Sequence, residues 1–292
     1  MEEVSYPKAG PSIEANVGDG HWRKGPSDTL PPPDTVGPYM RNRPLPVDQV
    51  EGRKAWIIGS GIAGVASAFY LIRDGRMKGQ DITILDAVGT PGGSLDGSGN
   101  AEDGYLIRGG REMNWNYDHF WDLFQDIPAL EYPSPYSVLD EYRAVNDNDP
   151  NWSKSRLMHK QGQIRDFSTL GLSSAHQWEL IKLLLKRKED LDDITIEQYF
   201  SDSFLETNFW YLWRSMFAFQ NWQSLLEVKL YMHRFLDAID GLTDMSALVF
   251  PKYNQYDSFV VPLVNYLKGQ GVNVEFGTRV YDLDMTDNNG ER

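Results

Sequence analysis

The spacing of the hydrophobic positions changes several times along the chain, and the first clear pattern follows Lys54. Residues 55–58 (Ala-Trp-Ile-Ile) form an apolar run that stops at Gly59, which is typical of a buried parallel strand. Residues 62–73 then carry apolar side chains at helical spacing, with Gly75 just past the end as a stop signal. A second strand is expected at 81–85. Strand, turn, helix and strand in about thirty residues predict a βαβ unit.

The middle of the chain has a helical and aromatic pattern. Three stretches with the Ser/Thr-x-x-Glu/Gln pattern of a capping box precede apolar-periodic segments, at Ser174–Gln177, Thr195–Gln198 and Ser224–Glu227. The predicted helices span 178–188, 196–219 with a break, and 225–239. The end of the chain returns to sheet, with a helix expected at 256–267 and strands at 273–276 and 278–283.

This pattern predicts four regions. Residues 1–50 hold nine of the sixteen prolines and no periodic apolar pattern, so we expect an arm rather than a domain. The next region, 51–114, contains the βαβ unit and the segment after it. A mainly helical domain is expected at 115–250, and 251–292 returns to the first domain. The expected fold class is therefore α/β, with a helical, aromatic-rich domain inserted.

Composition excludes several kinds of function. With 42 acidic and 28 basic side chains the net charge is −14, which gives a nucleic-acid partner no electrostatic basis. Cysteine is absent, so disulfides, thiolate metal sites and a cysteine nucleophile are excluded, and the five histidines show no metal-ligand spacing, so no metal is predicted. No apolar run is long enough for a membrane span and no signal peptide is evident, so a cytoplasmic protein is expected.

The basic stretch 182–188 suggests a solvated helix face, with peripheral membrane contact as the alternative. A homodimer is left open.

The candidate chemistry starts at Gly59-Ser60-Gly61-Ile62-Ala63-Gly64, which fits the dinucleotide motif G-x-G-x-x-G. The motif alone is weak evidence, but here it follows a predicted strand, opens a predicted helix and precedes Asp86 at the end of the next strand. Gly59 permits the tight turn, Gly61 lets backbone amides approach a pyrophosphate, and the helix N-terminus supplies partial positive charge. Asp86 would accept hydrogen bonds from the adenosine ribose.

Two later glycine pairs favour FAD over a nicotinamide cofactor. Pro91-Gly-Gly-Ser94 follows soon after Asp86, where FAD proteins of the glutathione-reductase-like type often place a second glycine pair. Arg108-Gly109-Gly110-Arg111 follows the strand-like 105–107, and its missing side chains would let the backbone lie against a flat ring system.

Over roughly residues 46–287 the sequence resembles the oleate hydratases, which are FAD-containing fatty acid hydratases once called myosin-cross-reactive antigens. The matching stretches are 57–64, 71–77, 92–97 and the segment Arg108-Gly-Gly-Arg-Glu-Met113. The resemblance implies a Rossmann-like FAD-binding domain and a hydro-lyase that adds water across the cis double bond of an unsaturated fatty acid, with oleate to 10-hydroxystearate as the type reaction. FAD would then serve structure and local electrostatics, without net redox change.

The resemblance also implies residue roles. Glu112 would activate water, Tyr231 would donate the proton, and Gln255 would contact the fatty-acid carboxylate. The cofactor-binding residues would be Gly59, Ser60, Gly61, Ala63, Gly64, Asp86, Gly93, Ser94, Arg108, Gly110, Arg111, Met113 and Val280.

From the residues alone, Arg108 and Arg111 should keep Glu112 ionised, and the alternative is an ion-paired surface acid. Tyr231 falls beside an apolar helical stripe, on the face of Glu227 and Arg234, where the alternative is a core tyrosine. The aromatic residues between 210 and 222 suit an acyl tunnel or a plain core.

Family members are considerably longer than this chain, so the resemblance implies a truncated product, one half of a split protein or a fragment, with little hydratase activity of its own. Two other functions stay open. An FAD oxidoreductase of the amine oxidase or desaturase type rests on the dinucleotide motif alone, and a non-catalytic flavin- or lipid-binding fragment rests on the early stop.

Overall fold

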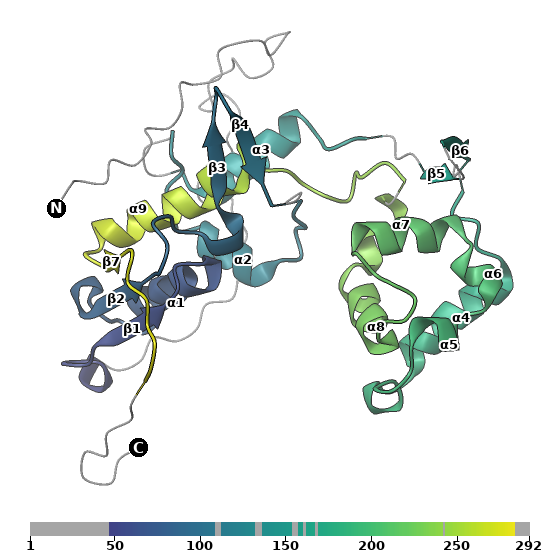
Figure 1. Ribbon diagram of the computed structural model, residues 1–292, viewed down its shortest axis with the longest axis horizontal. Helices are drawn as coiled ribbons and strands as arrows, with labels where there is room; N and C mark the ends of the chain where they lie inside the picture. Colours follow the sequence, from purple (N-terminus) through teal and green to yellow (C-terminus); the bar gives the residue numbers. More distant parts are fainter. Residues whose placement is uncertain are drawn as a thin grey trace. The chain divides into compact units, whose positions relative to one another are not determined.

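The expected βαβ unit is present in the computed structural model of this chain, in which β1 (Ala55–Ile58), α1 (Ile62–Arg73) and β2 (Ile82–Leu85) follow one another (Figure 1). The structure describes residues 47–108, 112–131, 136–153, 157–159, 162–166, 169–241 and 243–283. The arm expected at 1–50 therefore lies almost entirely outside the described residues.

These strands belong to a parallel sheet in the order β1-β2-β7, where β7 is Asn273–Glu275. Ile57, Ile84 and Val274 are in register across the three strands and share one face, on which Ile84 is fully buried. The helix α1 packs on this sheet with Val65, Ala68 and Phe69 buried. On the other face Trp56 and Ile58 are exposed, so the described part of the chain covers one face of the sheet.

The strand expected at 278–283 is not formed. Gly277 has a φ of 68°, which turns the chain directly after β7, and the following residues have no strand partner within the described part. The N–H of Thr278 donates instead to the carbonyl of Asp86 (2.8 Å), so this segment passes the carboxyl end of β2 as extended chain.

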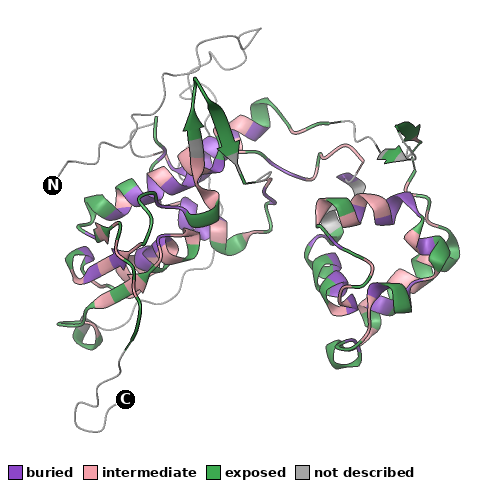
Figure 2. Cartoon of the chain, viewed as in Figure 1, coloured by how far each residue is buried: buried purple, intermediate pink, exposed green. Residues whose placement is uncertain are grey.

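Several further elements surround the sheet. They are η4 (Val47–Gln49), η5 (Gly79–Asp81), η6 (Gly93–Leu95), the antiparallel hairpin of β3 (Gly97–Asn100) and β4 (Gly104–Ile107), α2 (Asp118–Phe124), α3 (Val138–Asn148), the π-helical turn η9 (Tyr256–Val260) and α9 (Val261–Gly269). The core between α2, α3 and η9 is aromatic, with Trp121, Phe124, Tyr142 and Phe259 almost fully buried (Figure 2). Arg73 ties α1 to α2 through ion pairs with Asp122 and Asp126.

The helix expected at 256–267 begins with a wider turn. Residues of η9 form a π-helical turn, and the regular helix α9 starts at Val261, with Pro262 in its first turn. Proline lacks a backbone N–H and its ring crowds the preceding turn, so regular α-helical hydrogen bonding cannot run unbroken through this point.

The helical region contains more and shorter helices than expected. Its elements are β5 (Leu157–His159), β6 (Gln163–Arg165), α4 (Ser174–Leu185), η7 (Lys188–Asp190), α5 (Ile196–Tyr199), α6 (Asp202–Leu205), α7 (Asn208–Met216), α8 (Leu225–Arg234) and η8 (Leu236–Gly241). The helix expected at 196–219 is divided because Ser201 and Thr207 each accept a hydrogen bond as N-caps, which restarts the helix. The helix expected at 225–239 ends at Arg234 and continues as η8.

Of the three expected capping boxes, one forms where predicted, one forms a residue earlier, and the third lacks its side-chain hydrogen bond. Thr195 forms one with Gln198, as predicted. The box predicted at Ser174 is formed one residue earlier, by Ser173 and His176, so α4 begins before the expected 178. Ser224 precedes α8 but its side chain accepts no cap hydrogen bond.

The chain divides into two compact units. The first contains the described residues within 47–112, 117–149 and 250–283, and the second contains 113–116 and those within 150–249. The boundary expected at 115 thus lies near 150, because α2 and α3 pack with the sheet unit. In the second unit Phe200, Phe204, Phe209, Trp210 and Trp213 form the buried aromatic core.

Candidate functional site

The glycine-rich turn after β1 has the geometry that the motif predicts. Gly59 has a φ of 94°, in the left-handed region that side chains rarely adopt, and Gly61 is the N-cap of α1. No side chain caps the N-terminus of α1. Its first amide groups therefore lack the usual side-chain acceptor, and the helix dipole adds partial positive charge at the same place.

Gly64 is required by close packing. A Cβ at this position would overlap the carbonyl oxygen of Gly59 and lie 3.3 Å from the side chain of Ile57. Only glycine allows the first turn of α1 to approach the end of β1 this closely. Ala63, between Gly61 and Gly64, is exposed at the start of the helix.

The second glycine pair lies beside this turn. Gly61 and Gly92 form an isolated parallel bridge, and the N–H of Gly92 donates to the carbonyl of Ser60 (2.8 Å). A Cβ on Gly93 would lie 3.1 Å from the Cα of Gly61, whereas a Cβ on Gly61 would meet only the Cα of Gly93, at 3.9 Å. Ser94 is exposed in η6. Two backbone segments without side chains therefore adjoin at the start of α1.

Asp86 holds this turn in place. Its Oδ2 accepts hydrogen bonds from the backbone N–H (2.7 Å) and the hydroxyl of the fully buried Ser60, and its Oδ1 accepts from the N–H of Val88 (3.0 Å). Burial alone would raise the pKa of Asp86, but the hydrogen bonds from Ser60, Val88 and Ala87 outweigh it and lower the pKa. Asp86 is therefore an anionic acceptor at the carboxyl end of β2.

Residues 254–260 pack against the second glycine pair. A Cβ on Gly92 would lie 3.0 Å from Val260, and a Cβ on Gly97 would lie 3.2 Å from Tyr256. Gln255 precedes η9 and is 2% exposed, and its Nε2 has no hydrogen-bond partner in the part of the chain that the structure describes. A buried amide donor without an acceptor is costly, so this group is suited to an external acceptor such as a carboxylate.

The segment predicted to lie against a flat ring is only partly described, since Gly110 and Arg111 lie outside the described residues. Arg108 pairs with a different carboxylate, since its Nε and Nη2 donate to Asp96 (2.7 and 3.1 Å), and it is not among the causes that shift the pKa of Glu112. Burial raises the pKa of Glu112. The expectation that adjacent arginines keep Glu112 ionised is therefore wrong for Arg108.

Glu112 has a titratable neighbour within the first unit. Burial raises the pKa of Tyr142, and the negative charge of Glu112 raises it further, so these two groups of the first unit are close. Met113 belongs to the second unit, where its N–H and carbonyl pair with Val249 (2.9 Å each). Val280 is half-buried in the extended segment after Thr278.

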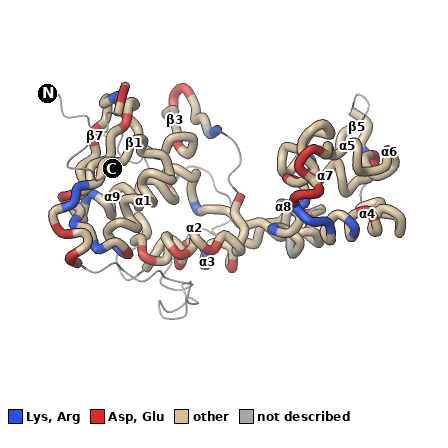
Figure 3. Tube along the Cα trace, turned by 90° about the horizontal axis from the view of Figure 1, so that it is seen from below, with Lys and Arg blue, Asp and Glu red and all other residues tan. Residues whose placement is uncertain are grey.

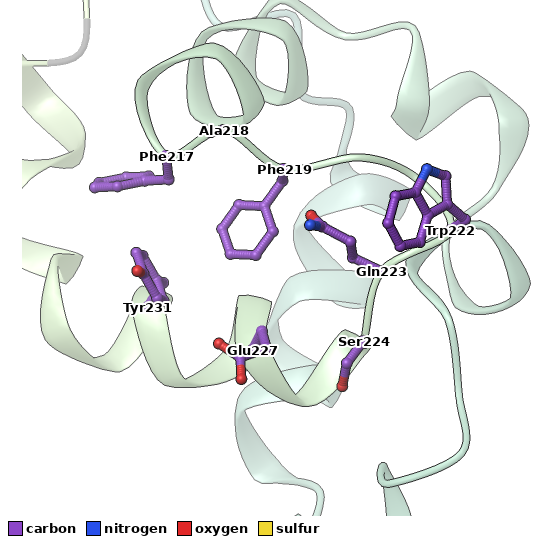
Figure 4. A pocket seen from close by; sticks show the side chains of 8 residues that line it. All are labelled: Phe217, Ala218, Phe219, Trp222, Gln223, Ser224, Glu227 and Tyr231. Carbon is purple, nitrogen blue, oxygen red and sulfur yellow. The ribbon is translucent and has the colours of Figure 1, made fainter. Parts of the chain in front are cut away.

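Tyr231 lies in a pocket of the second unit with a volume of about 370 Å³, lined by Phe217, Ala218, Phe219, Trp222, Gln223, Ser224, Glu227 and Tyr231 (Figure 4). Its ring meets Phe217 and Phe219 edge to face, with centroids 5.3 and 5.2 Å apart. Glu227 lines the same pocket from the preceding turn of α8, as the helical spacing predicted, while Arg234 donates to the carbonyl of Asn116 (3.1 Å). The phenol is partly exposed and is not a core tyrosine.

The backbone conformation of Ala218, which orients the rings of Phe217 and Phe219, is not predicted by the sequence. Ala218 has a φ of 59°, a left-handed conformation that is uncommon for a residue with a Cβ. It lies between Phe217 and Phe219, and with this bend both rings contact Tyr231. Nothing in the local sequence marks Ala218, since glycine or asparagine would be the usual residue there.

The structure thus brings together the turn 59–64, Asp86, Gly92, Gly93 and the segment 254–260 in the first unit. Glu112 belongs to the first unit and Tyr231 to the second. Among the described residues, no group of three or more His, Cys, Asp or Glu side chains is arranged to hold a metal ion. In the same part of the chain, no helix is both long and apolar enough to cross a membrane.

Comparison with known proteins gives close relatives in sequence. The oleate hydratase of Streptococcus pyogenes serotype M49 (strain NZ131) is 43% identical over 252 residues, which are 85% of this chain and 42% of that protein. The linoleate hydratase of Lactiplantibacillus plantarum is 32% identical over 238 residues, covering 75% of this chain and 42% of that protein. The chain therefore spans less than half the length of these relatives.

An oxidoreductase from Methanosarcina mazei superposes with a TM-score of 0.44 at 13% identity, covering 77% of this chain and 51% of that chain, a likeness too weak to inform function. The model of the MCRA family matches residues 52–292, which is most of the sequence. This chain belongs to the MCRA family.

Proposed function

We propose that this chain supplies the cofactor-binding and catalytic part of a fatty acid hydratase that adds water across the cis double bond of an unsaturated fatty acid, as in the conversion of oleate to 10-hydroxystearate. The observation that carries the proposal is the 43% identity to an oleate hydratase over 85% of the chain. The glycine turn and the pocket around Tyr231 are consistent with it.

The residues around the glycine turn fit an FAD molecule. The N-terminus of α1 has no side-chain cap and suits a pyrophosphate. Because Gly61 and Gly93 have no side chains, the backbone at these two residues could approach the pyrophosphate closely. Asp86 would accept hydrogen bonds from the ribose with the lone pairs that Ser60 and Val88 leave free. Further contacts are assigned to Ala63, Ser94, Arg108, Gly110, Arg111, Met113 and Val280. When bound, FAD would supply structural support and local electrostatic stabilisation without net redox change.

Hydration of an isolated double bond requires a base and an acid on opposite sides of the alkene. Glu112 would take a proton from a water molecule while the oxygen of that water bonds to one alkene carbon. Tyr231 would give its phenolic proton to the other alkene carbon. One proton then returns from Glu112 to Tyr231 through solvent, so both groups are regenerated and no electrons leave. The raised pKa of Glu112 makes it a stronger base than an ordinary glutamate.

Gln255 would hold the substrate carboxylate through its buried Nε2, which has no hydrogen-bond partner among the described residues. The aromatic pocket of Phe217, Phe219 and Trp222 would contact the apolar acyl chain near Tyr231.

The test is anaerobic incubation of oleate with FAD in ¹⁸O-labelled water, followed by mass spectrometry. Because this chain spans less than half of its relatives, a hybrid is assayed as well, in which residues 52–292 replace the matching part of the streptococcal hydratase. We expect a hydroxy acid labelled at its hydroxyl oxygen, without any electron acceptor. An unlabelled product, turnover only with an acceptor, or an inactive but folded hybrid beside an active parent would contradict the proposal.

A matched variant ties this activity to the proposed acid. In the hybrid, Tyr231→Phe removes one hydroxyl and keeps the ring contacts with Phe217 and Phe219, so we expect the hydration rate to fall by about 10² to 10⁴ with the fold intact. Tyr211→Phe, which changes another partly exposed tyrosine of the second unit outside the pocket, is the control. Equal loss in both variants, or none in Tyr231→Phe, would remove Tyr231 from this role.

A further inference from the structure

The pocket around Tyr231 has aromatic walls and one negative charge. Its rings come from Phe217, Phe219, Trp222 and Tyr231, and among the described residues that line it only Glu227 is charged. Figure 4 shows that the side chains of Glu227 and Tyr231 both extend from α8 toward the side of the pocket formed by Phe217 and Phe219. Contact with an apolar acyl chain accounts for the rings but not for the carboxylate.

The carboxylate of Glu227 is available to a ligand. No described residue donates a hydrogen bond to it or forms an ion pair with it. It lies four residues before Tyr231, so the two side chains share one face of α8. The side chain is exposed, so water hydrates the carboxylate in the free protein. A ligand that fills the pocket would displace part of this water and would feel the negative charge more strongly.

Basic residues on α7 and α8 (Figure 3) are directed to other partners. Arg214 of α7 donates to the side chain of Gln220 (3.0 Å). On α8, Lys229 donates to a backbone carbonyl at the end of α4, and Arg234 donates to another carbonyl (3.1 Å). His233 is not a lining residue of the pocket. A molecule in the pocket therefore meets a negative charge and aromatic rings, without a basic side chain among the lining residues.

Hydration of an isolated alkene passes through a state that has positive charge on carbon. The π electrons of the double bond form the new C–H bond with the proton of Tyr231, so the other alkene carbon becomes electron-deficient until the water oxygen bonds to it. A carboxylate stabilises such a charge by Coulomb attraction, and aromatic rings stabilise it through their negative faces. A purely aliphatic pocket would leave the charge without compensation.

We propose that this pocket is a site for positive charge, in which Glu227 and the rings of Phe217 and Phe219 stabilise the cationic transition state of hydration. The inference rests on the proposed function. It gives Glu227 a role distinct from those of the base Glu112 and the acid Tyr231, because Glu227 exchanges no proton and acts through its charge. The positive charge is present in the transition state but not in the bound alkene, so the interaction raises kcat and leaves substrate affinity nearly unchanged.

The first experiment measures binding to the purified chain by isothermal titration calorimetry, without turnover. Two analogues of octadecanoic acid are compared, one with a secondary ammonium group in place of the methylene at position 10 and the other with an ether oxygen there. The two analogues have nearly the same size and differ in charge at the place of the reacting carbon. We expect the ammonium analogue to bind at least about tenfold more tightly.

Substitutions in the second unit show whether the pocket is the source of this preference. Glu227→Gln removes the charge and keeps the size, so it should reduce the preference for the ammonium analogue by about fivefold. Phe217→Leu, which removes a ring and keeps an apolar side chain, should reduce it as well. Glu206→Gln is the matched control, since it removes an exposed charge of the same unit outside the pocket and should keep the preference.

The second experiment measures oleate hydration by the hybrid hydratase. Glu227→Gln should lower kcat by at least about fivefold while KM stays within about twofold, and Glu227→Asp, which keeps the charge, should recover part of the rate. Glu206→Gln should leave both constants unchanged.

The outcomes separate this inference from the proposed function. If neither analogue binds, if both bind equally, or if Glu227→Gln keeps the preference as fully as Glu206→Gln, the inference is overturned even where the hybrid hydrates oleate. A rise in KM alone in Glu227→Gln would also contradict it. An inactive hybrid whose preference for the ammonium analogue depends on Glu227 would instead refute the hydratase function and support the site for positive charge.

Discussion

Gly61 and Gly64 belong to one short motif, but the structure requires them for different reasons. The space in front of Gly61 is open apart from Gly93, and a Cβ there would make an ordinary van der Waals contact. A Cβ on Gly64 would overlap the carbonyl of Gly59 within the protein itself. The first glycine therefore leaves room for a ligand, and the second leaves room for the chain.

This difference predicts distinct outcomes for two substitutions. Gly61→Val should keep the fold and weaken FAD binding by at least about tenfold, or about 1.4 kcal/mol, because the side chain occupies the space where the backbone meets the pyrophosphate. Gly64→Ala should lower the stability of the fold itself. Flavin titration and thermal unfolding of both variants measure the two effects. A Gly61→Val variant that retains flavin absorbance on purification would show that the pyrophosphate is not placed there.

Glu112 should control the acidic side of the pH profile of hydration. A general base must be ionised, and burial raises its pKa, so the rate should fall as the pH drops through a value above the ordinary 4.5. The measurement is kcat/KM of the hybrid hydratase against pH. Glu112→Gln should remove most of the activity, while the exposed Glu102→Gln should leave the profile in place. A midpoint at or below the ordinary glutamate value would argue against Glu112 as the base.

Among the elements, the turn between α7 and α8 is the one that shapes the pocket. The helix α7 ends at Met216, and Ala218 adopts its left-handed conformation two residues later. This bend places Phe217 and Phe219 around the ring of Tyr231, and Phe217 also stacks on Phe235 with centroids 4.8 Å apart. One backbone angle therefore sets three aromatic contacts.

Substitutions at Ala218 should reveal this strain. Ala218→Gly relieves the cost of a Cβ at positive φ, so the fold should be at least as stable as the unmodified chain. Ala218→Val adds a β-branched side chain where φ is positive and should destabilise by about 1 to 3 kcal/mol. Urea unfolding of both variants, with Ala175→Val on the exposed first turn of α4 as control, measures the difference. Equal stabilities for Ala218→Gly and Ala218→Val would show that the turn is not strained.

The stability of the folded chain should depend on pH through one buried acid. Glu141 on α3 is 6% exposed, and burial raises its pKa to about 7, with Glu131 adding to the rise and Lys252 opposing it. The folded state therefore keeps its proton between the ordinary value of 4.5 and about 7, where the unfolded chain releases it. This contribution to stability is complete below 4.5 and is lost as the pH rises through 7.

Glu141→Gln should remove this dependence. At pH 8 the variant should be more stable than the unmodified chain by about 1 to 3 kcal/mol, because no buried carboxylate has to form. Below pH 4.5 the advantage should disappear. Chemical unfolding across this pH range, with the exposed Glu197→Gln as control, tests the expectation. If the difference between Glu141→Gln and the unmodified chain were constant with pH, Glu141 would not be the group responsible.

Much of the first unit is predictable from local pattern. The bounds of β1 and α1 follow from an apolar run, a glycine turn and helical spacing, which depend on residues adjacent in sequence. The same holds for the capping box at Thr195. Between 196 and 219 the apolar periodicity suggested a longer helix, but Ser201 and Thr207 bind their own backbone and divide it. Local competition of this kind is visible in the sequence, although its outcome is not.

Other features depend on contacts between residues far apart in sequence. The register that pairs Gly97 with Ile107 places Asp96 opposite Arg108, and the guanidinium of Arg108 pairs with this carboxylate. Similarly, Gly277 turns the chain away from the ladder, so 278–283 forms no strand. The composition and the motifs were enough to identify the family and the glycine turn after β1, because those rest on residue identity and near spacing. The raised pKa of Glu112 and the bend at Ala218 are settled by packing, since burial and backbone strain arise only when distant segments meet.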